Sequence, residues 1–140
     1  MFRAGRFAMV HGGCLCGGIR YEISGKLDKM HFCHCQMCRR GHGTPFANYV
    51  AINPRDIHYT QGEELIARFP SSESTVRTFC SRCGSNLEFS PQTTPDETWI
   101  ASGGFDGDPQ IRPTFHIYVD SKAPWFEITD NLTQYPVSDD

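Results

Sequence analysis

The chain has 140 residues, with 13 basic against 16 acidic side chains and a formal net charge of -3 at pH 7. This length suits one domain, and shares of 39% apolar and 21% charged residues exclude a disordered chain. The acidic balance argues against a nucleic-acid-binding protein, and no apolar run reaches the ~18 residues that would predict a membrane span.

Short alternating apolar stretches, separated by many of the 13 Gly and 9 Pro, predict strands along most of the chain. A single turn of helix is expected near Gln36–Arg40, so the fold class is mainly β. With no repeat and no low-complexity linker, we expect one domain. In chain order the expected strands are Ile19–Ile23, Met30–Phe32, Pro45–Ile52, Ile57–Tyr59, Leu65–Phe69, Thr75–Phe79, Asn86–Phe89, Thr98–Ala101 and Phe115–Val119.

Large aromatic side chains are expected in the core or packed beside the cysteines described below. They are Phe46, Phe79, Phe89, Trp99, Phe105 and Trp125.

The seven cysteines are an odd number, which does not fit a fully paired disulfide framework. The N-terminal stretch 1–10 is too short, and too interrupted by Arg3 and Arg6, to be a secretory signal. We therefore expect a cytoplasmic protein whose thiols are reduced and held by metal. The cysteines form three clusters, which are Cys14 and Cys16, then Cys33, Cys35 and Cys38, then Cys80 and Cys83.

The first and third clusters together supply four soft ligands. Cys80-Ser81-Arg82-Cys83-Gly84 is typical of a tight turn that directs two thiolates at one point, and Gly84 permits the positive φ that such a turn often needs. Cys14 and Cys16 add the second pair. We predict that these four cysteines form a closed, structural zinc site, which joins the N-terminal segment to the middle of the chain.

The middle cluster, Cys33, Cys35 and Cys38, places three thiolates within six residues and leaves no further cysteine to complete a site. Zinc with three protein ligands keeps one position for water or substrate, as in catalytic centres. The predicted cofactor content is thus two zinc ions per chain. One alternative is a closed second site completed by His31 or His34, and another is an iron–sulfur cluster, although such clusters usually take four protein ligands.

Two histidines near the middle cluster are further candidates. His42 is a candidate catalytic acid or base, because imidazole transfers protons near neutral pH, and the alternative is a turn residue at the surface. His34 lies between two of the cysteines. Its side chain is expected to point away from the metal if both neighbours point toward it.

Four motifs together resemble those of the glutathione-dependent formaldehyde-activating enzyme family, which also includes centromere protein V. They are G-x-C-x-C-G-x-x-x-Y from Gly12, C-H-C-x-x-C-R from Cys33, R-x-F-C-x-x-C-G-S-x-L from Arg77 and the tail HIYVDSKAPW from His116. The resemblance runs from about Gly12 to Pro136. It divides the chain into an N-terminal extension (1–11), the zinc domain (12–136) and a C-terminal tail (137–140).

The family resemblance implies a single zinc domain of short antiparallel strands, like methionine sulfoxide reductase B and Rab exchange factors. It also implies a structural zinc on the first and third clusters, and an exchangeable catalytic zinc on Cys33, Cys35 and Cys38. The implied activity is that of a carbon–sulfur lyase acting on the adduct of glutathione, or another thiol, with formaldehyde or a related electrophile. Three thiolates and Zn²⁺ carry a formal charge of −1, which makes a weak Lewis acid and favours a role in holding the thiol.

The alternative function is a non-catalytic module with two structural metals that binds a protein partner. A chromatin role like that of centromere protein V is not expected, because the chain has no basic extension. Neither a nucleic-acid nor a membrane partner is expected, and no feature of the sequence predicts an oligomeric state.

Overall fold

The computed structural model describes residues 9–139. Residues 1–8, which include Arg3, Arg6 and most of the expected N-terminal extension, lie outside the described residues, as does Asp140. The mainly β class is confirmed. In chain order the strands are β1 (Val10–Gly13), β2 (Arg20–Ile23), β3 (Met30–Cys33), β4 (Ala47–Ile52), β5 (Ile57–Gln61), β6 (Ile66–Ser72), β7 (Thr75–Cys80), β8 (Asn86–Pro91), β9 (Thr98–Ala101), β10 (Phe115–Ile117) and β11 (Thr133–Gln134).

The helical content is small. The predicted helical turn is confirmed as α1 (Gln36–His42), which ends where Gly43 takes a positive φ of 66°. Within 9–139 no helix has the length and apolar character needed to cross a membrane. Short 3₁₀ turns join strands at η1 (Pro54–Asp56), η2 (Glu63–Leu65), η3 (Ser102–Gly104) and η4 (Val119–Ser121).

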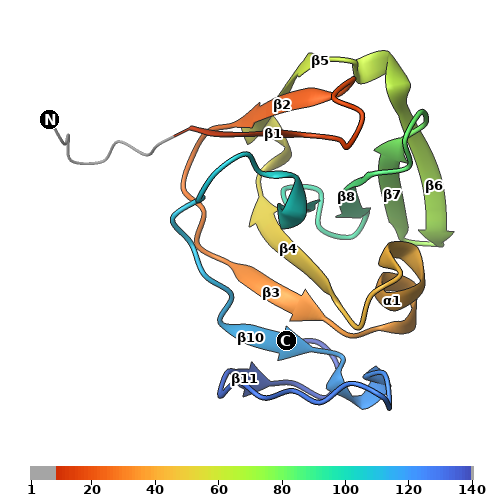
Figure 1. The fold of residues 1–140 in the computed structure, drawn as a ribbon, viewed down its shortest axis with the longest axis vertical. Coiled ribbons are helices and arrows are strands. Elements are labelled where there is room, and N and C mark those ends of the chain that lie inside the picture. Colours follow the sequence, from red (N-terminus) through yellow and green to blue (C-terminus); the bar gives the residue numbers. More distant parts are fainter. Residues whose placement is uncertain (1–8, 140) are drawn as a thin grey trace, which may run out of the picture.

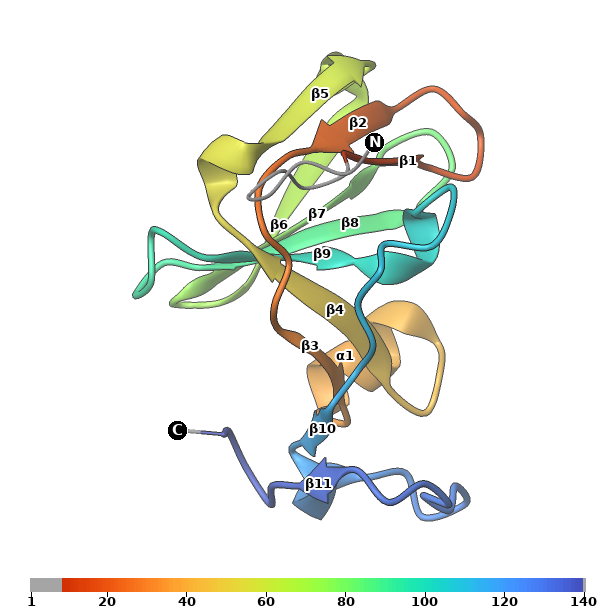
Figure 2. The same ribbon diagram turned by 90° about the vertical axis from the view of Figure 1, so that its left-hand side faces the viewer.

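The strands form two sheets. β1, β2 and β5 make a small antiparallel sheet, while the larger sheet has the order β11-β10-β3-β4-β9-β8-β7-β6. Figures 1 and 2 place the small sheet at one end of the molecule and β10 with β11 at the other. β10 pairs in parallel with both β3 and β11, so the larger sheet is mixed at this end. This parallel pairing brings the C-terminal segment beside the middle cysteine cluster.

The central strands of the larger sheet bury side chains on both faces. Val50 and Ile100 belong to a core cluster that also holds Tyr21 of the small sheet, so this cluster lies between the two sheets. Tyr49 and Trp99, one residue away along the same strands, belong to a second cluster that includes Cys33 and Cys38. Because strand side chains alternate between faces, the middle cysteines lie on the face away from the small sheet.

The expected packing of the aromatic residues is confirmed in part. Trp99 is buried, and Phe105 and Phe89 pack against the first and second core clusters respectively. The prediction is wrong for Trp125, which is 71% exposed. Trp125 lies in the loop between η4 and β11 and belongs to neither core cluster, because this segment runs along the outer end of the larger sheet.

Two cysteine groups and the cavity beside the second

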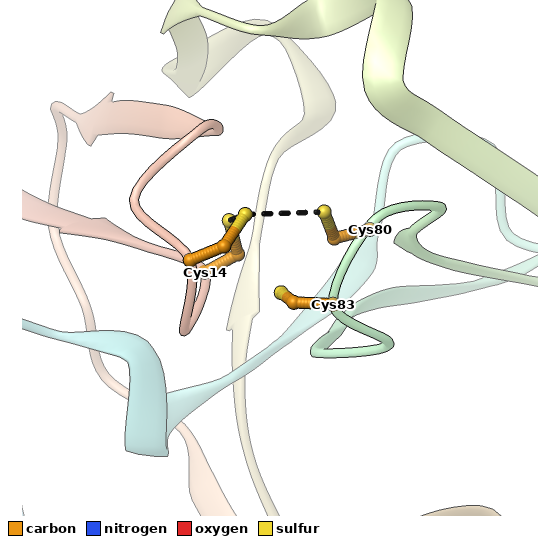
Figure 3. A group of neighbouring side chains, drawn as sticks. Cys14, Cys80 and Cys83 are labelled. Carbon is orange, nitrogen blue, oxygen red and sulfur yellow. Dashed lines mark hydrogen bonds between the residues drawn. The ribbon is translucent and has the colours of Figure 1, made fainter.

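The four-cysteine group lies where two hairpin turns meet. Cys14 and Cys16 come from the β1–β2 turn, while Cys80 ends β7 and Cys83 lies in the turn that follows it. The labelled side chains converge from opposite sides (Figure 3). The Sγ atom of Cys16 lies 3.5 Å from that of Cys14 and 3.9 Å from that of Cys80. The turns are joined directly by the Leu15 N–H, which donates to Ser85 Oγ at 2.8 Å.

The spacing of these sulfur atoms fits a tetrahedral zinc site. Four sulfurs bonded to zinc at about 2.3 Å lie about 3.8 Å apart, close to the observed separations, whereas a disulfide requires about 2.05 Å. All seven cysteines are free thiols. Backbone N–H groups donate to Cys14 Sγ from Ile19, at 3.2 Å, and to Cys80 Sγ from Arg82, at 3.4 Å. Such donors favour the thiolate that a metal requires, and at Cys80 the donor opposes burial, which raises the pKa of that thiol.

Local conformation and charge support the same interpretation of the four-cysteine group. Gly84 has a φ of +81°, the left-handed conformation expected after the second cysteine of a tight turn. A hydrogen bond from the Ser85 side chain lowers the pKa of the Cys83 thiol to about 5. The backbone N–H of Gly18, followed by the Arg82 guanidinium, lowers the pKa of the Cys16 thiol. This group can hold a metal ion as thiolates.

The three-cysteine group lies around the end of β3 and the start of α1. Cys33 ends β3, Cys35 caps the N-terminus of α1 by accepting the Cys38 N–H at 3.3 Å, and Cys38 is the buried residue of that helix. Their sulfur atoms lie within 4.8 Å of one another. Within residues 9–139 no His, Asp or Glu completes this group, and neither His31 nor His34 belongs to it. The described residues thus offer three ligands and no fourth.

A cavity of about 440 Å³ opens directly onto the three cysteines. Its walls include Arg77 on β7, Phe89 on β8 and Trp99 on β9, and all three side chains lie on the cysteine face of the larger sheet. A second cavity of about 560 Å³ is lined by Cys14 and His42 but by none of the three middle cysteines. The smaller cavity is the candidate site, because three side chains that could hold a metal ion line it together.

Arg77 provides the positive charge beside the three-cysteine group. Its guanidinium donates to Cys38 Sγ at 3.7 Å and to the Tyr49 hydroxyl at 3.2 Å, and it lies 5.4 Å from the Phe89 ring centre. Hydrogen bonds from the thiols of Cys33 and Cys38 lower the pKa of the Cys35 thiol, and Arg77 acts in the same direction. The three sulfurs therefore lie in surroundings that favour at least one thiolate.

The family of the chain follows from its match to a known family model. The model of the glutathione-dependent formaldehyde-activating enzyme family matches residues 9–121. The chain belongs to this family. A Schizosaccharomyces pombe protein that bears the name of an uncharacterized lyase is 23% identical over 128 residues, which cover 91% of each chain.

The fold also has a counterpart among solved structures. The crystal structure of a Rhodobacter sphaeroides protein superposes with a TM-score of 0.60 and 21% identity, covering 70% of this chain and 89% of that one. This likeness concerns the fold alone. The cysteine motifs of the formaldehyde-activating family thus lie on an architecture found in another solved chain.

His42 lies close to the three-cysteine group without lining its cavity. Its Nε2 atom is 2.6 Å from the Tyr49 hydroxyl, which in turn accepts from Arg77. Burial, and next the Arg77 charge, lower the pKa of His42 to about 4. The structure thus links this predicted candidate to the cysteines through Tyr49 and Arg77, and a role in proton transfer stays a proposal.

His34 points away from the three cysteines, as its position between two of them led us to expect. The side chain is fully buried, and its Nε2 atom lies 2.8 Å from Nδ1 of His116, in the C-terminal motif shared with the family. The Nε2 atom of His116 contacts Asp130 at 3.0 Å. This chain of polar contacts ties the C-terminal segment to the backbone that carries Cys33 and Cys35.

Three residues that line the cavity were not predicted from the sequence to do so. They are Lys29, Arg77 and His31, the last of which was considered only as a metal ligand. A signal was present for two of them. Lys29 and His31 precede Cys33 at intervals of two residues, and this spacing places side chains on one face of a strand. Arg77 lies on another strand, so its contact with Cys38 depends on the sheet order.

Proposed function

We propose that the protein is a zinc-dependent carbon–sulfur lyase. Its substrate is the adduct of a thiol, such as glutathione, with formaldehyde or a related small electrophile. The observation that carries this proposal is the three-cysteine group at a cavity, with no fourth protein ligand among residues 9–139. Membership of the formaldehyde-activating family and a relative named as a lyase support the same reaction class.

The donor set fits zinc at both cysteine groups. Cys14, Cys16, Cys80 and Cys83 would hold a structural ion, and Cys33, Cys35 and Cys38 would hold an ion with one free coordination position. A zinc ion held by the three thiolates would offer that position to a thiol and favour its deprotonated form. Arg77 offsets part of the negative charge of the group through its contact with Cys38.

The reaction in the lyase direction breaks one C–S bond of a hydroxymethyl thioether. The bonding electron pair stays with sulfur, while the hydroxyl group loses its proton and becomes the carbonyl group of formaldehyde. The cavity walls, chiefly Phe89 and Trp99, orient the adduct and reduce the water around the sulfur atom. We propose that the hydroxyl proton passes to solvent, and that His42 takes part only indirectly, through Tyr49 and Arg77, because neither His42 nor Tyr49 lines the cavity.

We expect the protein to accelerate exchange between formaldehyde, glutathione and their adduct above the spontaneous rate. The adduct forms rapidly without an enzyme, so the measurement is two-dimensional exchange NMR at equilibrium with and without protein. A parallel series with other small thiols identifies which thiol is used. Equal exchange rates with and without zinc-loaded protein, for every thiol, would contradict the lyase proposal and favour a non-catalytic partner-binding module.

We also expect two zinc ions per purified chain, one for each cysteine group. The ion at the three-cysteine group should leave first in a mild chelator, because it has fewer protein ligands and faces a cavity. The measurement is elemental analysis during chelator titration, with Cys38→Ala as the variant that lacks the second site. A content of one tightly bound zinc per chain, with the same content in Cys38→Ala, would refute the open second site.

A further inference from the structure

The cavity beside Cys33 extends along β3 past the three-cysteine group. Side chains of a strand alternate between its faces, so Cys33, His31 and Lys29 follow one another along the cavity. Lys29 precedes β3, but its carbonyl accepts the Ala51 N–H at 3.0 Å and so continues the pairing with β4. At about 3.3 Å per residue, the backbones of Lys29 and Cys33 lie about 13 Å apart. The cavity thus has a cysteine end and a lysine end.

His31 lies between these two ends and has unused hydrogen-bonding capacity. Its side chain is 2% exposed, and neither ring nitrogen has a hydrogen-bond partner among residues 9–139. The ring stacks on Trp99 with centres 4.3 Å apart, which fixes its orientation. A buried polar atom without a partner destabilises the folded state, and a ligand that bonds it offsets this cost. The cavity therefore suits a ligand with a polar group at this point.

At the lysine end, a carboxylate of the chain itself already contacts Lys29. The Lys29 ammonium lies 3.1 Å from the Oδ2 atom of Asp139, which lines the same cavity. It also lies 5.4 Å from the Trp99 ring centre and 6.0 Å from that of Phe115, and these aromatic faces hold the cation in place. The two side chains are 35% and 24% exposed, and ion pairs at such positions are weak. Another carboxylate could replace Asp139 at little cost.

Lys29 is also the cation of the cavity that remains accessible to a ligand. The other lining cation, Arg77, donates to Cys38, to the Tyr49 hydroxyl and to Ser71 Oγ. A ligand that engaged Arg77 would have to break several of these bonds. A ligand that engages Lys29 displaces one carboxylate.

We propose that the lysine end of the cavity is a carboxylate subsite. The inference rests on the proposed function and names its substrate class, a thiol adduct that carries a carboxylate several bonds from sulfur. The sulfur atom lies at the cysteine end, a polar group of the substrate contacts His31, and the carboxylate replaces Asp139 at Lys29. Asp139 is then an internal competitor that occupies the subsite when substrate is absent.

The kinetic test compares glutathione with glutathione diethyl ester, which has the same thiol but no carboxylates, each with formaldehyde. The measured quantity is kcat/KM for glutathione divided by kcat/KM for the ester. In Lys29→Met we expect this ratio to fall about tenfold, because one charge-assisted contact with the substrate carboxylate is lost. Lys29→Arg should restore the ratio. Lys26→Met should keep the wild-type ratio, because Lys26 is exposed and lies outside the cavity. This variant controls for the loss of one positive charge.

Asp139→Asn should act in the opposite direction, because it removes the competing carboxylate. We expect KM for the glutathione adduct to fall about two- to fivefold with kcat little changed, as for loss of a weak ion pair. An unchanged or higher KM in this variant would overturn the role of Asp139 as a competitor. A ratio in Lys29→Met that equals the wild-type ratio would overturn the subsite itself.

Binding of S-methylglutathione separates this inference from the proposed function, because its blocked sulfur undergoes no exchange. Calorimetry should show weaker binding to Lys29→Met and tighter binding to Asp139→Asn than to the wild type. If these shifts occur in a protein that does not catalyse exchange, the subsite is supported and the lyase proposal fails. If exchange is catalysed but neither variant changes binding or KM, the lyase proposal holds and the subsite is rejected.

Discussion

Replacing Cys80 with Ser is expected to unfold the protein. Cys80 is fully buried, and its group joins two turns whose cysteines are 64 residues apart in the chain. A structural zinc of this kind contributes about 10–16 kcal/mol, which matches or exceeds the usual 5–15 kcal/mol free energy of unfolding of a domain. Serine is a poor zinc ligand, so the variant should lose the ion together with the junction between the small sheet and the β7–β8 turn.

Circular dichroism and thermal unfolding of the purified variant, with its zinc content, measure this effect. Ser81→Ala is the matched control, because it changes an exposed side chain in the same turn and leaves the four ligands intact. A Cys80→Ser protein that keeps the wild-type Tm, in the presence of a chelator, would show that the four-cysteine group has no structural role.

Replacing Cys35 with Ser is expected to abolish activity while the protein stays folded. Cys35 is half-buried, and its main structural contact is the cap at the start of α1, where its sulfur accepts the Cys38 N–H. Serine is among the preferred residues at helix N-caps, so the helix should persist. The proposed open zinc site, by contrast, would be left with two thiolates. We expect kcat/KM to fall by at least about 100-fold. Loss of a residue that only supports a metal ligand already lowers activity by up to about 100-fold, and Cys35 is itself a proposed ligand.

The exchange assay and a thermal melt, run on the same preparation, separate these two effects. Gln36→Ala serves as the control, since it changes an exposed residue next to Cys35 and removes no ligand. Equal destabilisation by Cys35→Ser and Cys80→Ser would remove the distinction between a structural and a reactive group. Full activity of Cys35→Ser would show that the reaction does not depend on the three-cysteine group.

The two cysteine groups lie in different structural settings, which explains why they are expected to behave differently. Cys14 and Cys80 belong to the core cluster between the two sheets, where a bound ion would substitute for part of a hydrophobic core. Cys33 and Cys38 belong to the cluster on the other face of the larger sheet, beside the cavity. An ion in the second setting can exchange its free position with a ligand without disturbing the junction between the sheets.

The sequence alone was sufficient for the features that depend on local geometry. The positive φ of Gly84 and the short α1 follow from residues within one turn of each other, and most strands followed from period-two alternation. The short strands β1 (Val10–Gly13) and β11 (Thr133–Gln134) were not predicted, because four and two residues are too few to show an alternation of their own. The orientation of His34 away from its two cysteine neighbours was also predictable, because adjacent side chains in extended chain point to opposite sides.

Only the tertiary structure decided what surrounds the three-cysteine group. Arg77 reaches Cys38 because β7 and β3 belong to one sheet, and Asp139 reaches Lys29 because β10 pairs in parallel with both β3 and β11. Such contacts depend on strand order and register over long separations, which no local pattern encodes. The cysteine spacing thus determined which residues can bind metal, and the long-range strand pairing determined which side chains a substrate at that metal would meet.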